Sequence, residues 1–205
     1  MAAQTLQTTG FVLQRPPAED RHQQVLLLSA EAGQLLCFQR LSSRQPAVPL
    51  DLFDEVAATL TSSNQGRTWF FGEVRVLRRF SGIGLSFAAL KEASGFAALL
   101  TRNQVHEESR AAVLALLGTA LQAWNDGRRA DAVALKALYS FARSEGYPVK
   151  EDWAASLRGS DRENVRRVIN EPLAVLAAIE ADSVARLLES LRRYLRGNAE
   201  LAIGE

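Results

Sequence analysis

The sequence has one cysteine, one methionine and two histidines, and these scarcities exclude several kinds of site. The single thiol, Cys37, forms no internal disulfide and supplies no cysteine-based zinc centre, which is typical of a reducing cytosol. A catalytic triad needs a nucleophile, a base and an orienting group, and the only histidines, His22 and His106, are expected on the surface. No Walker A run, nucleophile elbow or HExxH segment occurs. We therefore expect no enzyme, no metal and no other cofactor.

An excess of charge of one sign is also lacking. The chain has 24 basic and 23 acidic residues, so its formal net charge is +1. Residues 1–80 hold eight basic and seven acidic residues, and residues 81–205 hold 16 of each. Proteins that coat nucleic acid through bulk charge are strongly basic, so an anionic partner here must be held by a local cluster. The basic residues are 21 arginines and three lysines, a bias that permits phosphate contacts or reflects carboxylate pairing or genomic base composition.

Long apolar runs are absent as well. No stretch approaches the roughly 20 apolar residues of a membrane span, and the first residues lack a basic segment followed by an apolar run. With 47% hydrophobic residues, the chain still has enough apolar material for a substantial core. We expect a cytoplasmic, nucleoid-associated protein that does not contact membranes.

The pattern of apolar residues changes near residue 80. Before it, short runs separated by turn formers predict five strands, around residues 11–13, 25–28, 35–38, 52–60 and 68–77. After Phe80 the spacing becomes helical. The predicted class is α+β, with a five-stranded OB-fold barrel over residues 1–80 and a helical bundle domain over residues 81–205.

Several helix ends are also marked in the second half. Gly146, followed by Pro148, predicts the end of a helix that begins near Asp131. Ser160 and Glu163 have the spacing of a capping box, and Pro172 suits the first turn of another helix.

An OB barrel binds nucleic acid across its second and third strands and through the loops that follow strands 1 and 4. Arginines at those places hold phosphates while aromatic rings stack on bases. The predicted DNA-binding residues are Arg21, Arg40, Arg44, Arg67 and Trp69. Four aromatic residues near these strands have an alternative role in filling the barrel core: Phe38, Trp69, Phe70 and Phe71. A second basic cluster, Arg75, Arg78 and Arg79, either contacts phosphate or pairs with acids of the helical domain.

Four segments, in this order, resemble the RecO family of bacterial recombination mediators. They are TTGFVLQRPPAEDRHQQVLLLSAEAGQLLCFQRLSSR, GRTWFFGEVRVLRRF, ALKALYSFARSEGYPV and SLRRYLRG. The resemblance implies an OB-fold barrel and a helical domain that bind single-stranded DNA, anneal complementary strands and assist DNA repair by recombination. It also implies two protein partners, RecR and the single-stranded DNA-binding protein.

Two departures from the family pattern affect this interpretation. Many members carry a Cys-x-x-Cys zinc module where this chain has residues 150–154, KEDWA. The basic segment after the third strand is also shorter here, and only Arg40 and Arg44 remain as counterparts. Because phosphate contacts supply most of the affinity, the thinner segment predicts weak, salt-sensitive binding. The alternative is a RecO-like scaffold with weak DNA binding that acts through protein contacts.

Overall fold

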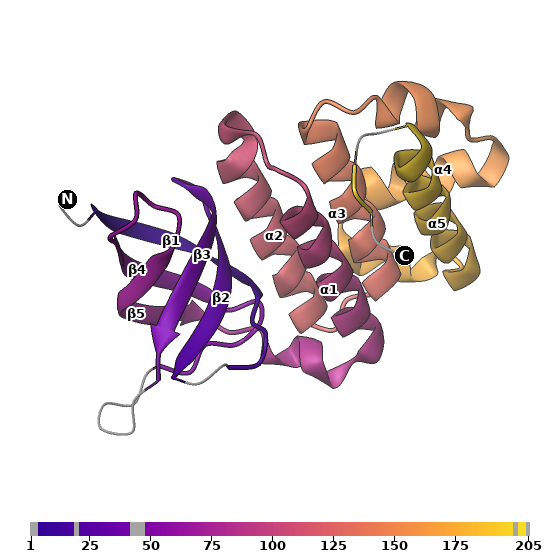
Figure 1. Cartoon of the computed structure of the whole chain (residues 1–205). Helices are drawn as coiled ribbons and strands as arrows, with labels where there is room; N and C mark the ends of the chain where they lie inside the picture. The colour runs from indigo at the N-terminus through magenta and orange to yellow at the C-terminus, as the bar shows by residue number, and fades with distance from the viewer. Residues whose placement is uncertain (1–3, 19–20, 42–47, 199–200, 204–205) are drawn as a thin grey trace. The chain divides into compact units, whose positions relative to one another are not determined.

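The computed structural model describes residues 4–18, 21–41, 48–198 and 201–203, and the chain divides into two compact units, 1–80 and 81–205 (Figure 1). The first unit is a closed five-stranded barrel and the second is helical, which confirms the predicted α+β class. The strands are β1 (Gln4–Gln14), β2 (His22–Ser29), β3 (Gly33–Arg40), β4 (Glu55–Ser62) and β5 (Trp69–Arg78).

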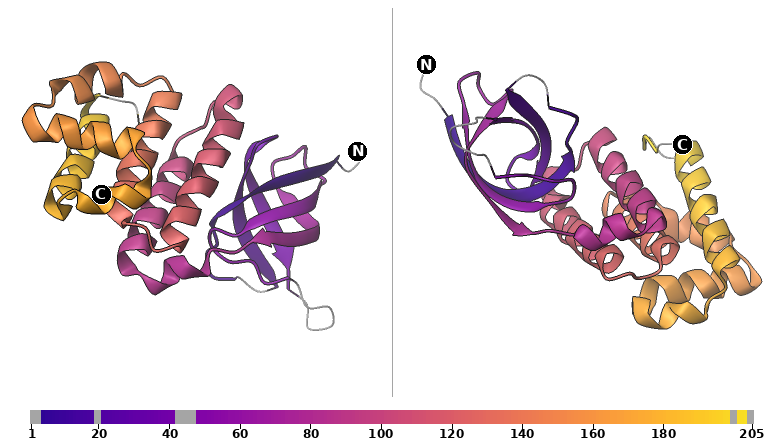
Figure 2. Two further views of the ribbon diagram at one scale, coloured as in Figure 1. Left: turned by 180° about the vertical axis from the view of Figure 1, so that it is seen from behind. Right: turned by 90° about the horizontal axis from the view of Figure 1, so that it is seen from below.

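The barrel closes in the order β1-β2-β3-β5-β4. All neighbours are antiparallel except β3 and β5, which run parallel and pair only at Cys37 with Trp69 and Phe38 with Phe70. Viewed from below, the strands curve around a ring (Figure 2). This is an OB-like arrangement, in which β2 and β3 form one outer face of the barrel.

The first and fourth strands differ from the predicted runs. β1 begins at Gln4, well before the apolar run at Phe11, and its polar start pairs with β4 from Gln4 opposite Ser62 to Phe11 opposite Glu55. The apolar pair Leu52 and Phe53 lies in a turn before β4. Backbone pairing along β4 therefore extends β1 beyond the segment that its apolar residues mark.

An extra residue in β5 changes which of its side chains face the core. Leu60 pairs with Phe71 and Ala58 pairs with Val74, so three steps along β5 match two along β4. Such a bulge shifts the alternation of the strand by one residue. As a result, both Phe71 and Val74 pack against the barrel core, which contains Val12, Val25, Leu27, Leu35, Cys37, Leu50, Val56, Ala58, Leu60 and Trp69.

The described part of the second unit contains five α-helices: α1 (Phe87–Arg102), α2 (Arg110–Asn125), α3 (Ala130–Ser144), α4 (Gly159–Asn170) and α5 (Ala181–Asn198). None of the helices in the described ranges is long and apolar enough to span a membrane. The end of α3 is as predicted, because Gly146 has a φ of 87° and its N–H donates to the carbonyl of Arg143 at 3.2 Å.

Two predicted helix starts are wrong in detail. The helix α4 begins at Gly159, so Ser160 lies inside its first turn. The N-cap residue, Arg158, makes no side-chain hydrogen bond to the backbone of the first turn. The capping-box spacing therefore occurs without the bond that it predicts. Pro172 precedes a short 3-10 turn, Leu173–Ala178, instead of opening an α-helix.

Two side chains anchor the connections of the helical unit. Arg129 binds Asp131 through Nε and Nη2, and it also donates to the carbonyls of Leu176, Ile179 and Glu180 before α5. The segment Val149–Ala154 forms one turn of π-helix. Its Trp153 is 3% exposed and donates from Nε1 to Ser190 Oγ at 3.1 Å, which fixes this turn against α5.

Candidate nucleic-acid interface

The outer face of β2 and β3 is formed by residues that alternate with the core. His22 pairs with Arg40 and Gln24 pairs with Phe38, so these four side chains share one face. On the neighbouring strand β5, Phe70 lies beside Phe38, with ring centroids 5.8 Å apart. His22 meets the same Phe70 ring edge-on at 6.5 Å. We call His22, Phe38 and Phe70 the aromatic face.

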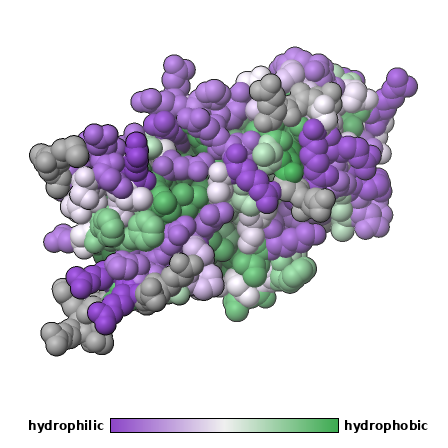
Figure 3. Space-filling model, in the orientation of Figure 1, coloured by the Kyte–Doolittle hydropathy of each residue, from purple (hydrophilic) through white to green (hydrophobic). Residues whose placement is uncertain are grey.

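The aromatic face is accessible and bordered by positive charge. Phe70 is 42% exposed, which is high for an aromatic ring in a strand. Arg40 follows Phe38 by two residues on β3 and is exposed. Arg21 is also exposed, and its carbonyl accepts from the N–H of Leu41 at 2.7 Å, so its backbone lies beside the end of β3. Figure 3 shows apolar surface over this side of the barrel with hydrophilic residues around it.

The two aromatic residues at the start of β5 have opposite environments. Trp69 is 8% exposed and belongs to the barrel core, so its ring faces are not available to a base. Phe70, the next residue, points outward. Of the two roles considered for this pair, Trp69 fills the core and Phe70 has the exposed ring that stacking requires.

Arg67 lies just before β5, the strand that carries Phe70. It is exposed in the turn between β4 and β5, two residues before Trp69, which is level with Cys37. The pairing of β3 with β5 begins at Trp69, so Arg67 lies before the first paired residue of β5.

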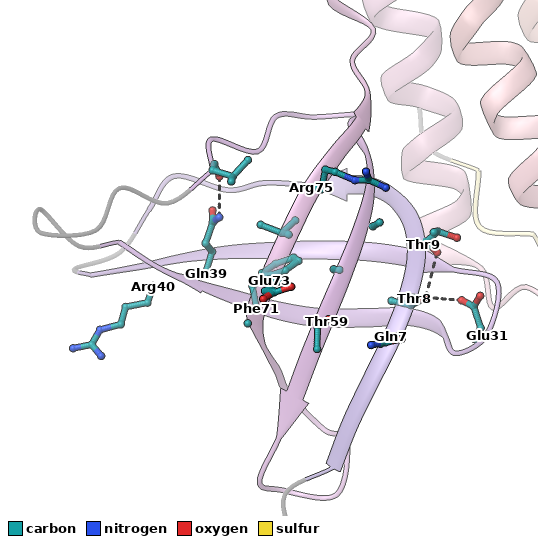
Figure 4. Close-up of a pocket in the computed structure, with 15 residues that line it drawn as sticks. Gln7, Thr8, Thr9, Glu31, Gln39, Arg40, Thr59, Phe71, Glu73 and Arg75 are labelled. Carbon is teal, nitrogen blue, oxygen red and sulfur yellow. Dashed lines mark hydrogen bonds between the residues drawn. The ribbon is translucent and has the colours of Figure 1, made fainter.

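Other predicted arginines fall elsewhere. Arg44 lies outside the described residues. Arg75 is exposed on β5 and lines a hollow of about 940 Å³ on the barrel, with Arg40 at its edge (Figure 4). Glu31 and Glu73 also line the hollow. A hydrogen bond from Thr8 lowers the pKa of Glu31, so this carboxylate is charged near neutral pH and disfavours a phosphate.

Arg78 and Arg79 pair with acids of the barrel itself. Arg78 binds Glu55 and lies over the ring of Phe80, 5.4 Å from its centroid. Arg79 donates from Nε and Nη2 to the two carboxylate oxygens of Asp54, at 2.9 and 2.7 Å. These bonds raise the pKa of Arg79. By contrast, no ion pair involves Arg21, Arg40 or Arg67 within the described ranges.

The cysteine is inert in the folded barrel. Cys37 is fully buried, and burial raises the pKa of its thiol from 9.0 to about 12. At pH 8 the thiolate is then about a thousandfold scarcer than in the unfolded chain.

We expect dithionitrobenzoate to label Cys37 only as the barrel unfolds. The raised pKa also stabilises the folded state below pH 9.0, and this stabilisation is lost as the pH rises to about 12. Labelling followed by absorbance, with and without guanidinium chloride, tests this expectation. Rapid labelling of the native protein would contradict it.

The described residues contain no group of three or more His, Cys, Asp or Glu side chains arranged to hold a metal ion. A scan against models of known protein families and a search of curated proteins both found no match. The interface is therefore interpreted from its own geometry.

Sequence reasoning named the arginines around the interface but not its aromatic members as a group. Phe38 and Arg40 are two residues apart on one strand, so their shared face follows from alternation alone. Phe70 joins them only through the pairing of β5 with β3, which no local pattern reveals. His22 lies at the start of β2, where the chain leaves a loop.

Proposed function

We propose that this protein is a RecO-like recombination mediator that binds single-stranded DNA on the aromatic face of its barrel. The observation that carries the proposal is the grouping of His22, Phe38 and Phe70 on one outer face of the barrel beside Arg40. Exposed rings beside cations that have no carboxylate partner in the described ranges suit a ligand with both bases and phosphates.

The same features favour a single strand over a duplex. The faces of unpaired bases are free to stack on Phe38 and Phe70, whereas bases within a duplex already stack on each other. Arg40 and Arg67 would contact the backbone, and contacts of this kind carry no sequence information. We therefore expect binding that depends weakly on sequence and strongly on salt.

The RecO-like assignment is supported by the order of the elements. An OB-like barrel precedes a helical unit, and β5 carries the segment WFFGEVRVLR, while α5 contains SLRRYLRG. Where the family often has a zinc module, this chain has the π-helical turn Val149–Ala154, anchored by Trp153. A buried indole would thus replace the metal as the anchor of this segment.

No covalent chemistry is part of this function. A mediator holds two complementary strands near each other, and its cations offset the repulsion between their phosphates. Bases stacked on Phe38 or Phe70 through one face keep their pairing edges exposed. Annealing of complementary oligonucleotides, followed by fluorescence quenching, measures this activity directly.

Arg40 and Arg67 should each contribute to the salt dependence of binding. We expect Arg40→Ala and Arg67→Ala each to weaken binding of a fluorescent oligo-dT several-fold. Each should also reduce the slope of log affinity against log salt by about 0.7, because one phosphate contact is lost. Fluorescence anisotropy over a salt series measures both quantities.

Arg166→Ala is the matched control, because Arg166 is exposed on α4 in the other unit. It should leave the affinity and the slope unchanged. Undetectable binding of oligo-dT by the wild-type protein at low salt would refute the DNA-binding proposal.

The alternative is a RecO-like scaffold that acts mainly through protein contacts. It is favoured by the ion pairs of Arg78 and Arg79 with Glu55 and Asp54, which leave fewer cations for DNA. Co-purification with RecR or with the single-stranded DNA-binding protein separates the two functions. Recovery that survives nuclease treatment supports the scaffold, whereas recovery abolished by nuclease supports binding through DNA.

A further inference from the structure

One side of β5 has no strand partner over much of its length. On its β4 side the strand is paired as far as Arg78, whereas on its β3 side it is paired only at Trp69 and Phe70. In the described ranges, residues 72–76 form no backbone hydrogen bond on that second side. We call residues 72–76 the free edge. An edge of this kind presents a row of N–H and C=O groups to a further strand.

The free edge is accessible from outside the barrel. Gln39 and Arg40 of β3 line the same hollow as residues 71–75 of β5, so open space separates the two strands beyond their last pair (Figure 4). Burial differs accordingly between two paired core-facing residues. Val56 of β4 is fully buried, whereas its partner Val76 on β5 is only partly buried. A second chain can therefore reach the backbone of β5 on this side.

The charges of the free edge are complementary to those of a second copy of the same edge. Glu73 and Arg75 are both exposed and lie two residues apart, so they share one face of β5. Neither of them forms an ion pair within the described ranges. If two copies pair antiparallel about a two-fold axis at Val74, Glu73 of each copy lies directly opposite Arg75 of the other. An edge with charges of one sign would instead repel its own copy.

We infer that this protein forms a symmetric dimer in which the free edges of two copies pair antiparallel, with the two-fold axis at Val74. The pairing adds two crossed Glu73–Arg75 pairs on the outer face of the joined sheets. It also brings together the Val74 side chains of the two copies, each of which is only partly buried in its own barrel. Gly72, which has no side chain, lies opposite Val76 and leaves room for it.

The symmetry of this contact limits the size of the assembly. Each copy uses the same residues, so the contact closes at two copies and leaves no further edge to pair. The contact is short and its charges are exposed, so we expect a weak dimer that salt weakens further.

The test measures the dissociation constant of the full-length dimer by sedimentation equilibrium, without DNA, so its result does not depend on the DNA-binding proposal. In Glu73→Arg, two arginines face each other in both crossed pairs, and in Arg75→Glu, two carboxylates do. We expect each variant to raise the dissociation constant about 10-fold or more, because two attractive pairs become repulsive. Both side chains are exposed, so the barrel should stay folded in each variant.

Two matched controls restore the opposite charges. The double variant Glu73→Arg/Arg75→Glu exchanges the two charges and should dimerise as tightly as the wild type. An equimolar mixture of the two single variants should form a mixed dimer, since each arginine of one chain then faces a carboxylate of the other. A wild-type protein that stays monomeric at millimolar concentration, or single variants that dimerise as tightly as the wild type, would overturn the inference.

Amide hydrogen exchange shows where the two copies meet. Exchange within residues 72–76 should slow as the protein concentration rises, because amides in a paired strand are protected. A dimer that forms without any change of exchange in this segment would use another surface, and that result would also overturn the inference.

Discussion

An Arg79→Ala variant is expected to lose about 3 kcal/mol of the free energy of unfolding, near the lower limit for breaking a buried ion pair. The side chain of Asp54 is fully buried and accepts two bonds from Arg79 and one from the N–H of Asp51, at 2.8 Å. Removing Arg79 leaves this carboxylate buried without its cation. The lower limit applies because Arg79 itself is 45% exposed, so water can partly replace it.

The neighbouring arginine provides a matched control. Arg78 pairs with Glu55, but 47% of its side chain is exposed and Glu55 is itself partly exposed. Exposed pairs of this kind contribute at most about 1 kcal/mol, so Arg78→Ala should change stability much less. Guanidinium denaturation followed by far-UV circular dichroism compares the two. An equal loss of the free energy of unfolding in Arg79→Ala and Arg78→Ala would contradict the expectation that Arg79 stabilises the buried carboxylate of Asp54.

A Phe70→Ala variant is expected to bind single-stranded DNA about 5- to 150-fold more weakly, as the loss of 1–3 kcal/mol for one stacked base implies. Phe70 contacts both other members of the aromatic face, so its removal also leaves the rings of Phe38 and His22 without their common neighbour. Anisotropy with oligo-dT at low salt measures the affinity.

The control for this change is Phe87→Ala in α1, because Phe87 is 84% exposed and lies in the other unit. It removes the same ring from a surface outside the proposed interface and should leave DNA binding unchanged. Phe87→Ala should keep the wild-type unfolding transition because its ring is exposed, and the unfolding transition of Phe70→Ala is measured to show that the barrel is folded at the temperature of the binding experiment. A wild-type affinity in Phe70→Ala would exclude stacking on this face.

The barrel and the helical unit were predictable because their signals are local. Apolar runs of strand length and the later helical spacing depend on neighbouring residues, and the turn at Gly146 depends on one glycine. The start of β1 was not predictable in this way, because the polar segment from Gln4 becomes a strand through its partner β4. Ser160 illustrates the opposite error, where a local pattern is present without the structure that it predicts.

The interface was only partly predictable, for a related reason. Arg40 and Arg21 come together because β2 and β3 form a hairpin, which sequence order already suggests. Trp69 is buried in the core and Phe70 is exposed because of the face of β5 that meets the core. Two adjacent aromatic residues in the sequence give no indication of which one will be buried. The pairing of Arg79 with Asp54 joins residues 25 apart, so no spacing rule reveals it.

The short parallel seam of the barrel has a consequence for its dynamics. β3 and β5 pair at only two positions, and one of these joins Phe38 to Phe70. The pairing of β3 with β5 closes the barrel, and the same pairing brings the rings of Phe38 and Phe70 together. A strand of DNA stacked across Phe38 and Phe70 would clamp the seam, and amide hydrogen exchange at the start of β5 should slow when it binds.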